Sequence, residues 1–175
     1  MYTMVEDKMA EDGNPWVKFT HIGVVVRDIG KAVDFYSAMG LGPFTRFRLP
    51  SDEFGHPKMV RHFGRDASDN VYEVAWGKFG DIAMELFQPI VGDSIPSRFL
   101  EAKGEGVWHY GYDVHSMDDT IAWMKSKGYE VVGESLTEDG VRMSYFNTND
   151  LGGIYFQAHE VPATSEMYEK LGGKM

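Results

Sequence analysis

Two stretches of the chain share the same order of hydrophobic and polar positions. Each begins with a run rich in β-branched and aromatic residues, at 18–26 and at 108–114, which predicts a strand. Apolar residues then recur at intervals of three and four, which predicts an amphipathic helix in each stretch. These apolar positions are Ile29, Val33 and Tyr36 in the first stretch, and Met117, Ile121 and Met124 in the second.

The ends of the two predicted helices are marked by residues with known capping preferences. Asp28 and Ser116 are expected N-caps, and Gly40 and Gly128 stand where the helices are expected to end. Strand patterns resume after each helix. They cover residues 43–49, 71–79 and 82–88 in the first stretch and 129–133, 141–147 and 153–159 in the second. Each half therefore reads as β-α-β-β-β.

The two halves also match residue by residue. His109 follows His21 by 88 positions, and at the same offset Gly111 follows Gly23. Apolar positions can coincide by chance, but a histidine and a glycine in register are harder to dismiss. The sequence therefore predicts an internal duplication within the α+β class.

The first half is longer than the second. His21 and Glu85 are 64 positions apart, whereas His109 and Gln157 are 48 apart, so about 16 extra residues fall within 49–70. This insertion mixes turn formers with charged and aromatic residues. A lid over a site and a solvated excursion are equally compatible with it.

The pattern divides the chain into five parts. We expect a polar tail over 1–15, a first module over 16–92, a linker with one short helix over 93–106, a second module over 107–162, and a tail or helix over 163–175.

Composition narrows the functional classes. Of the 175 residues, 43% are hydrophobic and 14% aromatic, which is enough for a buried core. The net charge of −10 argues against nucleic-acid binding, which needs clustered basic residues. Without cysteine there is no disulfide, thiolate metal site or cysteine nucleophile. The chain shows no signal peptide and no membrane-spanning run, so we expect a cytoplasmic protein.

Four polar residues stand in otherwise apolar strand patterns at related places of the two halves. They are His21, Glu85, His109 and Gln157. An ionised glutamate between Met84 and Leu86 is costly to bury unless it is paired. Imidazole nitrogens with carboxylate and amide oxygens form a mixed ligand set suited to Zn²⁺, Co²⁺, Ni²⁺, Mn²⁺ or Fe²⁺. A single divalent metal ion is therefore the expected cofactor.

The same segments resemble the vicinal oxygen chelate (glyoxalase/bleomycin resistance/extradiol dioxygenase) superfamily, most closely its methylmalonyl-CoA epimerase and glyoxalase I branch. The resemblance is carried by THIGVVVRDIGKAVDFY, DIAMELFQP, IPSRFLEAKGEGVWHYGYDV and DLGGIYFQAHE. It implies two βαβββ modules forming a cupped mixed sheet around a metal site. The implied ligands are the same four residues, His21, Glu85, His109 and Gln157.

The chain departs from the family pattern at the last motif. Epimerases and glyoxalases commonly have a glutamate there that binds metal and moves a proton, whereas a neutral amide such as that of Gln157 cannot accept one. Glu85 is then the first candidate base, and Glu73 on the neighbouring strand is a weaker one. His159 lies two residues beyond Gln157, where it is placed to act as fourth ligand or as an acid or base.

The function expected from the resemblance is that of a metal-dependent epimerase or isomerase. Its substrate would be a small carbonyl compound, with a methylmalonyl-CoA-like thioester as one example. Three alternatives remain: a glyoxalase I-like lyase, an Fe²⁺ extradiol-type dioxygenase, and a metal-free binding protein for small molecules. By analogy with the family we also expect a homodimer, with neither nucleic acid nor membrane as a partner.

Overall fold

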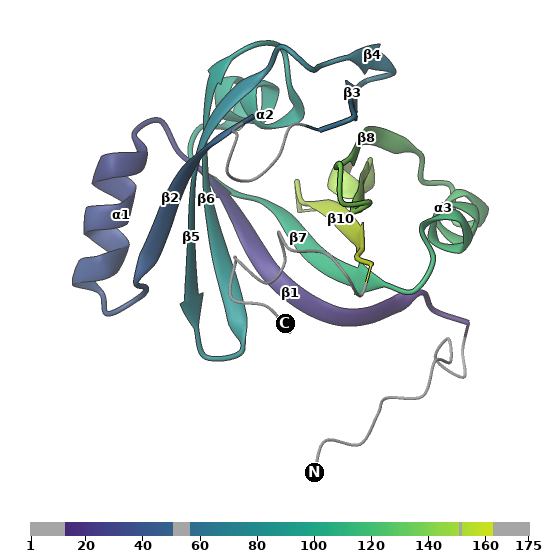
Figure 1. The fold of residues 1–175 in the computed structure, drawn as a ribbon, viewed down its shortest axis with the longest axis horizontal. Coiled ribbons are helices and arrows are strands. Elements are labelled where there is room, and N and C mark those ends of the chain that lie inside the picture. Colours follow the sequence, from purple (N-terminus) through teal and green to yellow (C-terminus); the bar gives the residue numbers. More distant parts are fainter. Residues whose placement is uncertain (1–12, 51–56, 151, 163–175) are drawn as a thin grey trace.

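The computed structural model describes residues 13–50, 57–150 and 152–162 (Figure 1). Residues 1–12 of the expected N-terminal tail, residues 51–56 of the insertion and the expected C-terminal tail or helix lie outside these ranges. The elements follow one another as β1 (Trp16–Val25), α1 (Ile29–Ala38), β2 (Phe44–Leu49), β3 (Met59–His62), β4 (Arg65–Asp66), β5 (Val71–Phe79), β6 (Ile82–Val91), α2 (Ile95–Lys103), β7 (Gly106–Val114), α3 (Met117–Ser126), β8 (Val131–Leu136), β9 (Arg142–Phe146), the 3₁₀ turn η1 (Thr148–Asp150) and β10 (Tyr155–Glu160). The α+β class is confirmed.

The strands of the described chain form one curled sheet, in the order β2-β5-β6-β1-β7-β10-β9-β8-β3-β4. Within each half the first strand pairs in parallel with the last, β1 with β6 and β7 with β10. The halves join where β1 and β7 run antiparallel to each other. The strand that opens each module therefore lies at the centre of the sheet, and the sheet curls around it to form a cup (Figure 1).

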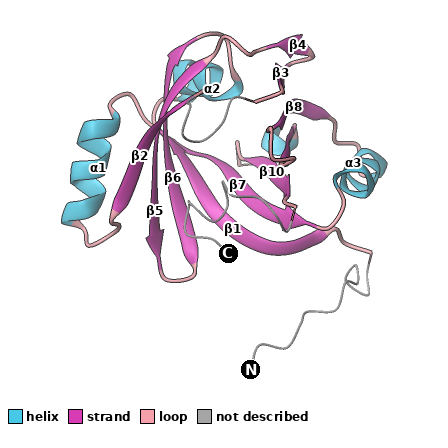
Figure 2. Ribbon diagram, viewed as in Figure 1, coloured by secondary structure: helices cyan, strands magenta, loops and turns pink. Residues whose placement is uncertain are grey.

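Helices α1 and α3 lie outside the cup, one against each half (Figure 2). Asp28 and Ser116 cap them as the sequence predicts, each accepting a hydrogen bond from the backbone N–H three residues later. Gly40 and Gly128 follow the helix ends with positive φ angles of 85° and 89°, a conformation that favours glycine. None of the helices in the described ranges is long and apolar enough to cross a membrane.

A second contact fixes each outer helix to its own module. The first backbone N–H of α1, at Ile29, donates to Gln88 Oε1 at 2.8 Å. The first N–H of α3, at Met117, donates to Glu160 Oε2 at 2.5 Å. Gln88 lies three residues after Glu85, and Glu160 three residues after Gln157, so the two modules repeat this tie at the same place.

The inside of the cup is packed with apolar and aromatic side chains at the end that α2 covers. Buried members of this inner cluster are Val25, Tyr72, Val74, Phe87, Ile95 and Trp108. Separate clusters lie outside the sheet, beneath α1 and beneath α3. The polar residues of the candidate site lie on the inner face of the sheet, beyond the inner cluster.

The described part of the insertion is attached to the second module and is not a free excursion. Its strand β3 pairs antiparallel with β8 of the second module, with Met59 opposite Leu136 and His62 opposite Gly133. The buried His62 also accepts a hydrogen bond at Nδ1 from the backbone N–H of Ile95, at 3.2 Å. This contact ties the insertion to the start of α2.

Candidate metal centre

The register of the central strands arranges the site in two rows. In one row Gly23 of β1 lies between Glu85 of β6 and His109 of β7. In the other row Gly111 of β7 lies between His21 of β1 and Gln157 of β10. Directly opposite residues of neighbouring strands point to the same face of a sheet. The four sequence-predicted ligand residues therefore share the inner face of the cup.

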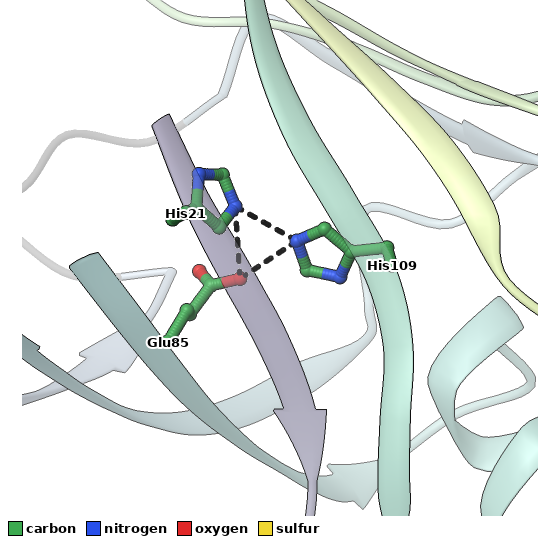
Figure 3. A group of neighbouring side chains, drawn as sticks. All are labelled: His21, Glu85 and His109. Carbon is green, nitrogen blue, oxygen red and sulfur yellow. Dashed lines mark hydrogen bonds and ion pairs between the residues drawn. The ribbon is translucent and has the colours of Figure 1, made fainter. Parts of the chain in front are cut away.

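Three of these side chains meet at a single point (Figure 3). His21 Nε2 lies 2.8 Å from His109 Nε2. Glu85 Oε2 lies 3.3 Å from His109 Nε2 and 3.8 Å from His21 Nε2. Both imidazoles are almost fully buried, and the Glu85 side chain is 14% exposed.

Burial controls the protonation of this group. It raises the pKa of Glu85 to about 8. It lowers the pKa of His21 and of His109 well below the ordinary value, since it penalises the charged form of each ring. Each histidine is therefore neutral and offers a lone pair at neutral pH, while Glu85 Oε2 has no hydrogen-bond partner among the described residues.

The group fits a divalent metal ion by its donor types and by its spacing. Two ligands held about 2.1 Å from one tetrahedral Zn²⁺ lie about 3.4 Å apart. The three separations of 2.8, 3.3 and 3.8 Å bracket that value. A bound cation would also compensate the buried carboxylate, whose Oε2 has no hydrogen-bond partner among the described residues. The residues that would hold it are His21, Glu85 and His109.

Gln157 lies beside this group with its amide held in place. Its Nε2 donates to the hydroxyl of Tyr145, directly opposite on β9, at 2.7 Å. Gln157 Oε1 is buried and has no hydrogen-bond partner in the described chain. An interaction with the Gln157 side chain opposes the fall in the pKa of His21, so the amide lies close to that ring. Gln157 Oε1 is therefore the nearest candidate for a fourth ligand atom.

A β-bulge precedes each site histidine. In the β1–β7 ladder, Phe19 pairs with Tyr112 and His21 with the next residue, Gly111, so that Thr20 is the extra residue. Trp108 is the extra residue at the equivalent place in β7. The Thr20 hydroxyl lies 3.0 Å from His21 Nδ1, whereas the Trp108 ring packs edge-on against His109, with centroids 4.2 Å apart.

His159 lies behind His21. Their rings stack with centroids 5.2 Å apart at an interplanar angle of 20°. Burial lowers the pKa of His159 to about 4, and its Nδ1 is 3.9 Å from Asp113 Oδ1. His159 thus contacts the group through the His21 ring.

Glu73 is not brought to the site. On β5 the residue opposite Glu85 is Trp76, which shares its face. Side chains alternate along a strand, so Glu73, three residues away, points to the outer face, where it is opposite Gln88. The sequence pattern located the strand, but it could not give the register that decides which face a residue occupies.

The roles of several residues that shape the site could not be predicted from the sequence. Gly23 and Gly111 were noticed as repeat partners, and the His-x-Gly spacing in both halves was the available signal. Thr20 and Trp108 owe their positions to bulges, and Tyr145 owes its contact to strand register. Nothing in the local sequence marks these last three.

Comparison with known proteins agrees with this geometry. Residues 20–145 match the sequence profile of the glyoxalase/bleomycin resistance protein/dioxygenase superfamily. An uncharacterized protein of Bacillus subtilis, YqjC, is 21% identical over 146 residues, covering 82% of this chain and 91% of that protein.

Two solved structures share the fold. The hypothetical protein BH1468 from Bacillus halodurans superposes with a TM-score of 0.60 at 20% identity, covering 85% of this chain and 97% of the other. Methylmalonyl-CoA epimerase from Mycobacterium tuberculosis superposes with a TM-score of 0.60 at 18% identity, covering 84% and 90%. The profile match spans well over half of the sequence and includes His21, Glu85 and His109. The chain therefore belongs to the glyoxalase/bleomycin resistance protein/dioxygenase superfamily.

Proposed function

We propose that the protein is a divalent-metal-dependent epimerase or isomerase that removes a proton from a carbon next to a carbonyl group. The observation that supports this most is the meeting of His21, His109 and Glu85, in which the buried Oε2 of the carboxylate has no hydrogen-bond partner among the described residues. Buried carboxylates of raised pKa cluster at functional sites. The conclusion rests on this group and on the superfamily to which the chain belongs.

The proposed reaction divides the work between the ion and the chain. A divalent ion in the group would supply Lewis-acid stabilisation of the negative charge that develops on the carbonyl oxygen. The neutral imidazoles of His21 and His109 hold the centre without adding charge. Gln157 is a neutral amide and cannot accept a proton, so Glu85 is the proposed base. It would take the proton and return it to the other face of the carbon in an epimerase, or to the next carbon in an isomerase.

The supporting residues keep this arrangement rigid and dry. His159 stacks on His21 and Trp76 packs on the same ring, with centroids 5.0 Å apart. Tyr145 holds the Gln157 amide. We assign these three residues to positioning.

We propose acyl-CoA thioesters that carry a second carbonyl oxygen as the first substrate class to test. A structural relative is a methylmalonyl-CoA epimerase, and such a substrate offers two neighbouring oxygens and an acidic carbon between carbonyl groups. Small hydroxy-ketones form the second class, because they offer the same pair of oxygens without the CoA group.

The test is metal analysis followed by proton–deuterium exchange. Purified protein is expected to bind about one equivalent of a divalent ion, and the loaded protein is expected to exchange the acidic proton of methylmalonyl-CoA in D₂O. Glu85→Ala is expected to lose both metal and exchange, because it removes a ligand and the base. Glu73→Ala is the matched control, since this glutamate lies on the outer face of the neighbouring strand. Full exchange in Glu85→Ala would overturn the proposal.

A second function is favoured by the composition of the group. Two histidines and one carboxylate are the ligand set of non-haem Fe²⁺ oxygenases. The superfamily's dioxygenases place that carboxylate on the last strand, however, where this chain has Gln157, so we rank this function second. Oxygen uptake by the Fe²⁺-loaded protein with a catechol, together with no proton exchange on the thioester, would reverse the order.

A further inference from the structure

We infer that Gly23 and Gly111 are positioning residues of the candidate metal centre, each reserving space for the histidine of the opposite module. Gly23 belongs to the first module and makes room for His109 of the second. Gly111 belongs to the second module and makes room for His21 of the first. As a statement about metal binding, this inference rests on the proposed function.

The space beside each glycine is already filled by an imidazole. A Cβ atom added to Gly23 would lie 1.9 Å from His109 Cε1 and 2.1 Å from its Nδ1. A Cβ atom added to Gly111 would lie 2.0 Å from His21 Cε1 and 2.3 Å from its Nδ1. Real Cβ atoms do not approach other heavy atoms this closely, so any larger residue at either place must displace the ring.

The requirement for glycine is one of space and not of backbone conformation. Neither Gly23 nor Gly111 is among the described glycines of positive φ, unlike Gly40 and Gly128 at the helix ends. Both pair with residues of the neighbouring central strands, next to the bulges at Trp108 and Thr20, and their φ angles are ones that alanine can adopt. Only the ring that lies over each glycine excludes a side chain.

Neither ring has room to move aside. His109 is fully buried, and the rings of Trp108 and Tyr145 lie 4.2 and 5.5 Å from it. His21 lies between the rings of Trp76 and His159, at 5.0 and 5.2 Å. In a close-packed interior a displaced ring moves its neighbours as well. The expected result of a methyl group at Gly23 is that His109 Nε2 leaves the point where it meets Glu85 Oε2.

Gly77 provides a matched control in the same sheet. It lies on β5 opposite Phe44, and a Cβ atom added there would lie 2.6 Å from Phe44 Cδ1. Gly77→Ala therefore also places a methyl group against an aromatic ring, but that ring packs against the cluster beneath α1. It separates general destabilisation from an effect on the metal centre.

The first experiment measures Zn²⁺ affinity by chelator competition. Gly23→Ala and Gly111→Ala are each expected to lose about 100-fold in affinity, the upper end of what loss of support to a metal ligand costs. Gly77→Ala is expected to stay within about threefold of wild type under the same conditions. Wild-type affinity in Gly23→Ala and in Gly111→Ala would overturn the inference.

The second experiment uses the stability of the metal-free protein, so it does not depend on metal binding. The shift in urea midpoint caused by Gly23→Ala is expected to shrink by at least half in a His109→Ala background and to remain in a His21→Ala background. The shift caused by Gly111→Ala is expected to shrink in the His21→Ala background and to remain in the His109→Ala background. An equal shift in both backgrounds would overturn the positioning assignment. If the variants show this crossed pattern but the wild-type protein binds no metal, the proposed function is refuted and the assignment of ring positions stands.

Discussion

The two halves of the candidate centre use the same backbone device but support their histidines differently. A bulge precedes each histidine, with Thr20 as the extra residue in the first half and Trp108 in the second. Thr20 gives His21 Nδ1 a polar contact at 3.0 Å. His109 Nδ1 has no hydrogen-bond partner among the described residues, and an indole packs against its ring instead. One histidine is thus oriented by a hydroxyl and the other by aromatic packing.

The last strands of the two modules, β6 and β10, also contribute different groups to the candidate centre. Glu85 brings an ionisable carboxyl group whose Oε2 has no hydrogen-bond partner among the described residues, whereas Gln157 brings a neutral amide that Tyr145 holds. The two modules place these residues at equivalent positions, but the two halves contribute different groups. The first half carries the charge, while the second half supplies packing and a fixed dipole. Four substitutions test this division, beginning with the largest expected effect.

Trp108→Ala tests whether aromatic packing is the main contribution of the second half. It leaves a large cavity in the inner cluster and is expected to lower the free energy of unfolding by about 3–5 kcal/mol. Thr20→Ala, at the equivalent bulge, is expected to cost only about 1 kcal/mol. Urea unfolding of the metal-free proteins gives both values. Similar losses in the two variants would remove the distinction between the halves.

Glu85→Gln tests the cost of the charge in the first half. The pKa of Glu85 rises from 4.5 to about 8 on folding, so between these pH values the folded protein holds a proton that the unfolded chain has released. The stability of the metal-free wild type should therefore fall, relative to Glu85→Gln, as the pH rises from about 4.5 to about 8. At roughly 1.4 kcal/mol per pKa unit, the gap should widen by a few kcal/mol.

This difference is read from unfolding curves of both proteins at several pH values. Other titrating groups are common to the two proteins and cancel. If the difference in unfolding free energy between the two proteins does not change with pH, burial does not raise the pKa of Glu85. Saturating Zn²⁺ should reverse the order of stabilities, because the ion stabilises the ionised carboxylate of the wild type only.

Thr20→Val tests the polar support of His21. The substitution keeps the shape of the side chain and removes the hydroxyl, so the His21 ring loses its contact at Nδ1. Loss of such a partner behind a metal ligand typically lowers metal affinity about 10- to 100-fold. Thr45→Val, at an exposed position of the edge strand β2, is the control and should leave affinity unchanged. Unchanged affinity in Thr20→Val would mean that packing alone orients both histidines.

Tyr145→Phe has the smallest expected effect. It removes the acceptor of the Gln157 amide, which should cost about 1 kcal/mol of stability and lower metal affinity a few-fold. Tyr110→Phe, on the outer face of β7 against Phe19, is the matched control. An affinity loss as large as that of Thr20→Val would show that the second half orients its ligand as strictly as the first.

Much of the architecture could be predicted from the sequence because its signals are local. Asp28, Ser116, Gly40 and Gly128 mark helix ends by their own conformational preferences, and the structure confirms all four. The runs rich in β-branched and aromatic residues at 18–26 and 108–114 predicted the opening strands, and the histidine and glycine in register predicted the repeat. Each half carries its own copy of the pattern, so each prediction had an internal check.

What could not be predicted depends on pairing between distant strands. The face that Glu73 occupies follows from its register with β6, and the bulges at Thr20 and Trp108 exist only in the ladder between β1 and β7. The attachment of the insertion to β8 joins residues more than 70 positions apart, such as Val60 and Ser135. Neither composition nor periodicity within 49–70 carries information about that partner.

The pairing of β3 with β8 also has a consequence during translation, because β3 is synthesised before its partner strand. Residues 59–62 leave the ribosome with the first module, but their partner residues 133–136 are translated much later. Until then the β3 edge has unpaired backbone groups, which can pair with strands of other nascent chains. The first module is therefore dependent on the second from the outset, and fusion or truncation at residues 93–106 would separate this edge from its partner. The pairing of β3 with β8 thus makes the two repeated modules a single unit of biosynthesis.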